Sequence, residues 1–170
     1  MNWVDVIAII ILILGLIGGV REGAIKGIFS LASLLIAIPC AGLSYSYIAA
    51  LLSFLPGTDW ENFLGFFIAL GIISALLHLI FLVPRKIGQK IWDQGVFFRL
   101  LGAVFNLLAA GIGLTVFMLV LTAYPIFDWL VDATSGSSIL RGLVLAFGFI
   151  QLMLPEALRK ASEIVAIITL

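Results

Sequence analysis

Four long apolar runs dominate the sequence, and short polar or charged stretches separate them. The runs extend over about residues 3–20, 28–52, 63–83 and 100–124. A helix needs roughly 20 residues to cross a hydrocarbon core of about 30 Å, so each run is near the length of one crossing. We therefore expect an all-α fold, a polytopic membrane helical bundle of four transmembrane helices in a single membrane domain over residues 1–170.

The composition supports a membrane environment. Hydrophobic residues make up 64% of the chain and charged residues 11%. In a typical soluble domain, about 45–50% of the residues are apolar and about 25% are charged. Nine Lys and Arg balance nine Asp and Glu, so no basic surface for nucleic acid is expected. Cys40 is the single cysteine and cannot form an intrachain disulfide or a multi-cysteine metal site. The expected partner is the lipid bilayer, and no cofactor or metal is expected.

Breaks in the apolar pattern predict where helices bend or end. The second run is longer than a bilayer requires, and Pro39 offers a place for a kink. The Ser44–Tyr47 stretch is typical of a helix end in the membrane interface. Turn residues at Pro56–Asp59 then separate the second run from the third.

Two further segments are predicted to be interfacial. Residues 85–97 combine basic residues with Ile87, Ile91 and Trp92, a pattern that favours a helix on the membrane surface. The apolar stretch Gly142–Leu154 reaches only about 20 Å as a helix. We expect the C-terminal region, residues 139–170, to be interfacial or re-entrant, and a fifth crossing is the rival interpretation.

The basic residues predict the orientation. Arg21 and Lys26 lie between the first two runs, and Arg85, Lys86, Lys90 and Arg99 lie between the third and fourth, whereas the loop around Asp59 has none. Because cytoplasmic loops are rich in Lys and Arg, the first and third loops should face the cytoplasm, with both termini outside. A fifth crossing would instead bring Arg159 and Lys160 to the cytoplasm.

Four glycines recur at every fourth position. Gly15, Gly19, Gly23 and Gly27 form one small-residue stripe if the helix continues through them. Such a glycine zipper lets another helix approach closely, either within the chain or between subunits. Alternatively, Gly23 ends the first helix, and the other glycines reflect the frequency of glycine in membrane helices.

Three polar residues near or within the runs each have two interpretations. Asp5 either caps the first helix, or it pairs with a basic group or interacts with a carried ion. His78 either relays protons or packs with a hydrogen bond. Asn106 either makes a hydrogen bond between helices or contacts a substrate. Capping and packing are the expected roles.

Catalytic motifs are missing from the sequence pattern. The runs contain no paired carboxylates and no closely spaced His and Glu ligands, and no glycine-rich phosphate loop occurs. We therefore expect that the protein is not an enzyme. An intramembrane enzyme would need a polar pair that converges inside the bundle.

Several short motifs resemble the colicin V production protein family (CvpA). They are Asn2-Trp3-Val4-Asp5, then Arg21-Glu22-Gly23-Ala24-Ile25-Lys26-Gly27 leading into Phe29-Ser30-Leu31, and later Arg99-Leu100-Leu101-Gly102. The resemblance covers roughly residues 2–120. The sequence departs from the family pattern at Phe98, where Asp is usual, and at Asn106, Ala109 and Ala110, where a Gly and an Arg-Gly pair are expected.

The resemblance implies a multi-pass protein of the bacterial inner membrane that is required for toxin biosynthesis. We expect a non-enzymatic accessory or transport-associated protein for colicin V production, export or envelope maintenance. The alternative is a small channel or transporter that works as a homo-oligomer, and a further possible partner is another membrane protein. The candidate functional or packing residues are Asp5, Gly15, Gly19, Arg21, Gly23, Lys26, Gly27, Arg99, Gly102 and Asn106.

Overall fold

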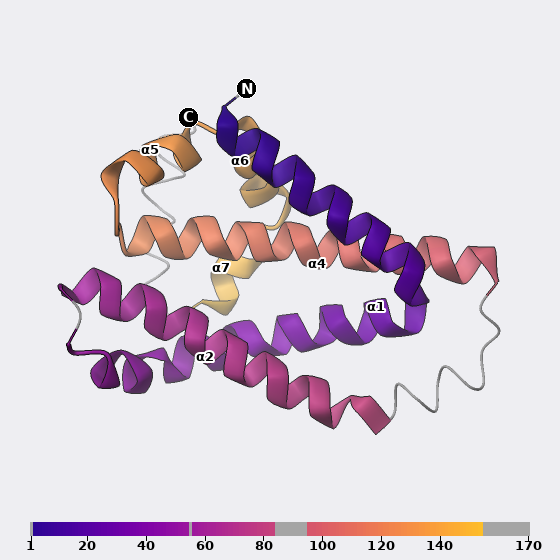
Figure 1. Ribbon diagram of the computed structural model, residues 1–170, viewed down its shortest axis with the longest axis horizontal. Helices are drawn as coiled ribbons and strands as arrows, with labels where there is room; N and C mark the ends of the chain where they lie inside the picture. The colour runs from indigo at the N-terminus through magenta and orange to yellow at the C-terminus, as the bar shows by residue number, and fades with distance from the viewer. Residues whose placement is uncertain (1, 55, 84–94, 155–170) are drawn as a thin grey trace.

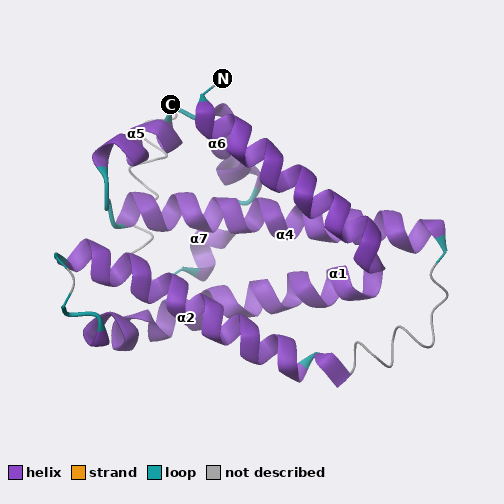
Figure 2. Ribbon diagram, viewed as in Figure 1, coloured by secondary structure: helices purple, strands orange, loops and turns teal. Residues whose placement is uncertain are grey.

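The computed structural model describes residues 2–54, 56–83 and 95–154, and these residues form helices and turns without a strand. The long helices are α1 (Trp3–Leu51), α2 (Thr58–Ile80) and α4 (Val96–Ala123) (Figure 1). Three shorter helices follow: α5 (Asp128–Ser135), α6 (Ser138–Ala146) and α7 (Ile150–Met153). Figure 2 shows the same all-helical arrangement with its short connecting loops.

Among the described residues, three helices, α1, α2 and α4, are long and apolar enough to cross a membrane. The first two apolar runs both belong to α1, which contains 49 residues. The expected loop between these runs is wrong, because the chain there is helical apart from a kink at Gly23. Gly23 has φ 76° and ψ 171°, a conformation that is essentially restricted to glycine.

The kink divides α1 into a first arm, residues 3–22, and a second arm, residues 24–51. Pro39, the predicted place for a kink, lies inside the helical second arm. The predicted helix end at Ser44–Tyr47 is also wrong, because α1 continues to Leu51. The bend is therefore made by a single residue with a positive φ, Gly23, and not by a loop.

Both arms lie along α4, so α1 folds back on itself (Figure 1). Near the kink, Gly19 and Gly27 both approach the backbone of Gly102 in α4. At the far end of the second arm, the Tyr45 and Tyr124 hydroxyls are 3.0 Å apart. Helix α2 packs against this second arm, where Gly65 faces Ala49.

Two apolar clusters of described residues hold the bundle together. The larger cluster joins the second arm, α2 and α4, and Ile38, Phe66 and Leu119 are among its buried members. The smaller cluster joins the start of the first arm to α4 and α6 through residues such as Ala8 and Met118. Many large apolar side chains remain exposed on the outer faces, as a bilayer environment permits.

The predicted interfacial segments are only partly described. Residues 84–94 lie outside the described residues, while Gly95 is the N-cap of α4 and the helix begins at Val96. In the C-terminal region, α6 and α7 are two short helices separated at residues 147–149. Residues 155–170 again lie outside the described part of the chain.

Candidate functional site

Asp5 lies at the centre of a polar cluster that joins the start of α1 to α5 and α6. Its side chain is 1% exposed. Oδ2 accepts a hydrogen bond of 2.7 Å from the Asn2 backbone N–H, and Oδ1 accepts from Ser137 Oγ at 2.5 Å and from the Ile139 N–H at 3.1 Å. The expected capping role is confirmed, because Asn2 and Asp5 form a capping box at the start of α1.

Asp5 also serves a second helix, which the sequence interpretation missed. Ser137 is the N-cap of α6 and accepts a hydrogen bond of 3.2 Å from the Leu140 N–H, while its hydroxyl donates to Asp5. One carboxylate therefore satisfies groups at the starts of both α1 and α6. A serine directly before an apolar helical segment is the signal that could have identified Ser137 as a cap.

Asn2 adds a second link between the same elements. Its side-chain amide donates a hydrogen bond of 2.8 Å to the Ala133 carbonyl oxygen in α5. The Trp3 and Trp129 rings lie beside it, with centroids 6.0 Å apart. The start of α1 is thus fixed to both α5 and α6. We call Asn2, Asp5, Ala133, Ser137 and Ile139 the terminal anchor.

The glycine stripe forms a close crossing with α4. A β-carbon on Gly19 would overlap the Gly102 carbonyl and lie 2.6 Å from the Ala103 Cα, and one on Gly15 would lie 2.9 Å from the Ala110 Cβ. A β-carbon on Gly102 would be 2.5 Å from the Gly19 carbonyl oxygen. These glycines pack two helices of one chain together.

Gly23 and Gly27 complete this crossing on the other side of the kink. Gly23 is buried, and its carbonyl oxygen would be 2.7 Å from a β-carbon on Gly102. Gly27 also faces Gly102, because a β-carbon on Gly27 would lie 3.2 Å from the Gly102 carbonyl oxygen. The stripe is not one straight seam as predicted, because the helix bends at its third glycine. We call Gly15, Gly19, Gly23, Gly27 and Gly102 the glycine crossing.

Asn106 and its neighbours lie on the same part of α4. The expected hydrogen bond from Asn106 to another helix is replaced by one within α4, since its Nδ2 donates to the Gly102 carbonyl oxygen at 3.4 Å. Ala110 faces Gly15, and Ala109 is half-buried beside it. Phe98 lies earlier in α4, where its ring contacts that of Phe97. His78 lies in the last turn of α2.

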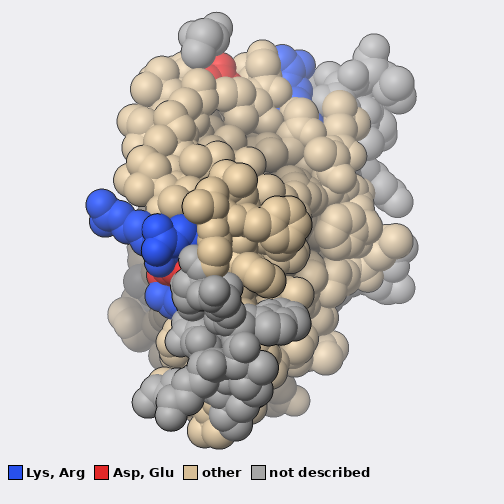
Figure 3. Space-filling model, turned by 90° about the vertical axis from the view of Figure 1, so that its right-hand side faces the viewer, with Lys and Arg blue, Asp and Glu red and all other residues tan. Residues whose placement is uncertain are grey.

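Basic side chains gather at the kink end of the bundle. Arg21 and Arg99 are exposed there, and Lys26 forms an ion pair with Glu22 across the kink. Figure 3 views this end, where one group of blue atoms lies on one side of a mostly tan surface and a second, smaller group lies at the top. Acidic residues mark the opposite end, because Asp59 lies in the first turn of α2 and Asp128 begins α5. The Trp60 and Phe127 rings join these two helix starts, with centroids 5.3 Å apart.

No group of three or more His, Cys, Asp or Glu side chains that could hold a metal ion occurs among residues 2–54, 56–83 and 95–154. The polar side chains of the terminal anchor instead bond to one another and to the backbone. The arrangement fixes helix ends and brings helices close together.

The model of the family described as colicin V production protein matches residues 4–148. The chain belongs to the colicin V production protein family. The match includes the glycine crossing and all of the terminal anchor except Asn2. Searches of curated proteins and of solved structures give no match. Together with the three apolar helices of spanning length in the described part of the chain, the family indicates a membrane protein associated with colicin V production.

Proposed function

We propose that this protein is a four-span accessory protein of the bacterial inner membrane that acts in colicin V production or export and in envelope maintenance, without catalysing a reaction of its own. The family match over residues 4–148 carries this proposal. The kinked α1, the distribution of charge and the hydrogen bonding of the polar side chains support it.

Four spans follow if each arm of α1 crosses the bilayer. The first arm extends from Trp3 to Glu22, about 30 Å at roughly 1.5 Å per residue, which matches the hydrocarbon core. This arm packs along α4 from Gly19, which contacts Gly102, to Ala8, which shares a cluster with Met118. The second arm accompanies α4 from Gly102 to Tyr124. The two arms run in opposite directions along α4, as two consecutive transmembrane helices would.

The charge distribution supports a cytoplasmic kink end. Arg21, Lys26 and Arg99 lie at this end, and Asp59 and Asp128 lie at the other. The excess of Lys and Arg in cytoplasmic loops then places the kink inside the cell and the terminal anchor outside. The basic end is suited to anionic lipid headgroups or to an acidic surface of a cytoplasmic partner.

The hydrogen bonding of the polar side chains favours an accessory role over conduction. Ser33, Thr115 and Thr122 each donate to a carbonyl four residues earlier in the same helix, and Asn106 does the same. A transport path through one chain needs polar groups directed toward a shared cavity. A homo-oligomeric channel is the alternative, and its path would have to form between copies.

The proposal is tested by deleting the gene in a colicin V-producing bacterium and measuring toxin inside and outside the cells. We expect secreted toxin to fall and to return with the wild-type chain. The triple variant Arg21→Gln, Lys26→Gln and Arg99→Gln should restore it poorly. The matched control Asp59→Asn, Glu61→Gln and Asp128→Asn, which removes three charges from the opposite end, should restore it fully.

Two outcomes overturn the proposal. Unchanged secretion after deletion removes the role in toxin production. Selective ion flux through liposomes that contain only the purified protein supports the channel instead. An intracellular accumulation of toxin in the deletion strain assigns the role to export, and loss of toxin in both fractions assigns it to synthesis.

A further inference from the structure

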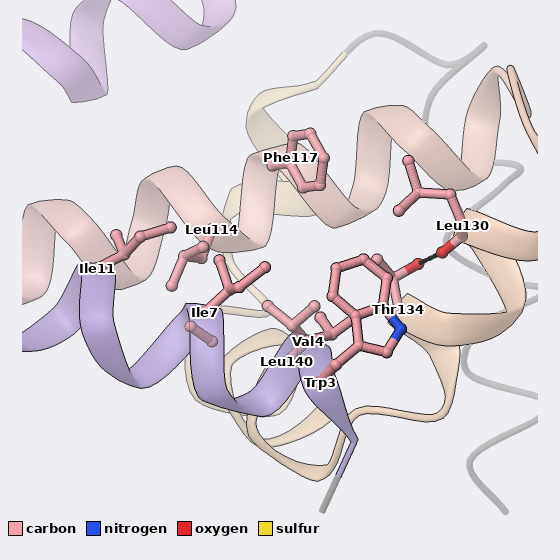
Figure 4. A pocket seen from close by; sticks show the side chains of 10 residues that line it. Trp3, Val4, Ile7, Ile11, Leu114, Phe117, Leu130, Thr134 and Leu140 are labelled. Carbon is pink, nitrogen blue, oxygen red and sulfur yellow. Dashed lines mark hydrogen bonds between the residues drawn. The ribbon is translucent and has the colours of Figure 1, made fainter.

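An apolar pocket of about 230 Å³ lies between the start of α1 and the helices α4, α5 and α6. Trp3, Ile7 and Ile11 line it from the first arm of α1, and Leu114 and Phe117 line it from α4 (Figure 4). Leu140 of α6 closes the side near the terminal anchor. Four helices therefore contribute to this pocket, since α5 supplies Leu130 and Thr134.

The lining selects for an apolar ligand. Among the described residues, no charged side chain lines the pocket. The Thr134 hydroxyl lines the pocket and lies 2.8 Å from the Leu130 carbonyl oxygen and 2.9 Å from the Val131 carbonyl oxygen. A polar ligand would lose its hydrogen bonds to water and find few replacements here, which is unfavourable for each buried polar group. Hydrocarbon incurs no such cost.

The position of the pocket matches the depth of lipid acyl chains. Trp3 and Trp129 pack together at its rim, and tryptophan is enriched at the level of lipid headgroups. From Trp3 the pocket continues along α1 to Ile11, about 12 Å deeper at roughly 1.5 Å per residue. Ile7 and Ile11 are partly exposed, so the pocket opens toward the side on which α1 meets lipid.

One basic residue near the rim can meet an anionic headgroup, although Asp128 and Asp132 of α5 make this end acidic. Arg141 directly follows the pocket residue Leu140 and is half-exposed. Among the described residues it is the one Lys or Arg near the terminal anchor, because Arg21, Lys26 and Arg99 lie at the kink end. A phosphate at headgroup level would be matched in charge by its guanidinium.

We propose that this pocket binds one acyl chain of a bilayer phospholipid, with the lipid phosphate near Arg141. The inference rests on the proposed membrane embedding of the first arm of α1. Because α1, α4, α5 and α6 all contact the bound chain, the lipid would strengthen the attachment of α5 and α6 to the bundle.

The test uses the full chain in lipid nanodiscs that contain a trace of phosphatidylglycerol with a photoreactive diazirine in one acyl chain. After irradiation, mass spectrometry locates the labelled residues. Leu114 and Leu140 are 9% and 2% exposed, so bulk lipid reaches them only through the pocket. We expect label at both, in addition to label on exposed residues of α2 such as Leu79.

Two pairs of variants make the assignment specific. Ile11→Trp and Ile7→Trp fill the pocket and should lower labelling of Leu114 and Leu140 severalfold. Ile10→Trp and Val6→Trp add the same bulk at neighbouring exposed positions that do not line the pocket and should leave labelling unchanged. Arg141→Gln should also reduce labelling of Leu140, without affecting Leu79.

The outcomes separate this proposal from the proposed embedding. Label on Leu79 with none on Leu114 or Leu140 overturns the pocket proposal and leaves the membrane bundle intact. No label on any helix contradicts the embedding itself. Equal labelling of Leu140 by a diazirine fatty acid that lacks a phosphate, unaffected by Arg141→Gln, overturns the assignment to a phospholipid.

Discussion

Ser137 Oγ donates a hydrogen bond of 2.5 Å to Asp5 Oδ1, although 132 residues separate them in the chain. The bond is buried, and the Ile139 N–H donates to the same oxygen. The start of α1 and the start of α6 are therefore held by one carboxylate. This relationship makes Asp5 a tertiary contact as well as a helix cap.

Replacement of Asp5 by Asn should destabilise the protein by about 1–3 kcal/mol, because a hydrogen-bonded buried acceptor is replaced by a group that also donates. Thermal unfolding of the purified protein in mild detergent measures the change. Asp132→Asn, at an exposed acid in nearby α5, is the control and should stay within about 0.5 kcal/mol of the wild type. Equal stabilities for the two variants would show that the terminal anchor contributes nothing.

Gly19 and Gly18 should respond in opposite directions to alanine. A β-carbon on Gly19 would overlap the backbone of α4, whereas one on Gly18 has nothing within 4 Å. Gly19→Ala should therefore cost about 1–3 kcal/mol through overpacking. Gly18→Ala should be neutral or stabilise by up to about 1 kcal/mol, since alanine favours the helix. Unfolding curves of the two variants compare them directly, and similar shifts would contradict a close crossing.

Gly23→Ala should open the angle between the two arms of α1. Alanine does not readily adopt φ 76° and ψ 171°, and the strain of about 1–3 kcal/mol favours a straighter helix. Spin labels at the exposed positions Leu14 and Leu43, in a Cys40→Ser background, report the distance between the arms by pulsed electron resonance. The distance should increase in Gly23→Ala and remain unchanged in Pro39→Ala. The reverse result would place the hinge at Pro39.

Local sequence signals predicted the helices well, because apolar run lengths and caps act over a few residues. The predicted end of the second run, residue 52, is one residue from the end of α1 at Leu51. Helix α4 begins at Val96, four residues before the predicted position 100. The kink was assigned to Pro39, although Gly23 makes it. The charged residues around Gly23 suggested a loop, but Lys26 and Glu22 pair on the helix surface instead.

The candidate site was predicted only in part. The cap at Asp5 and the close packing of the glycines could be anticipated from the residue type and the spacing of four. Their partners could not, because Ser137 and Gly102 are distant in sequence and only the fold-back of α1 brings them near. Asn106 was assigned an interhelical bond, yet its own helix offers a carbonyl four residues away at Gly102.

The last prediction concerns which side of the membrane each end of the bundle faces. Thr58 and Asp132 lie at the acidic end and Val96 at the basic end, and all three are exposed. Single cysteines at these positions, in a Cys40→Ser background, can be treated in intact cells with an impermeant maleimide. Positive-inside bias predicts labelling at Thr58 and Asp132, and labelling at Val96 only after the membrane is permeabilised. The opposite pattern would invert the orientation.

Labelling of Thr58 and Val96 from the same side would mean that α2 does not cross the membrane. The four-span arrangement would then be wrong.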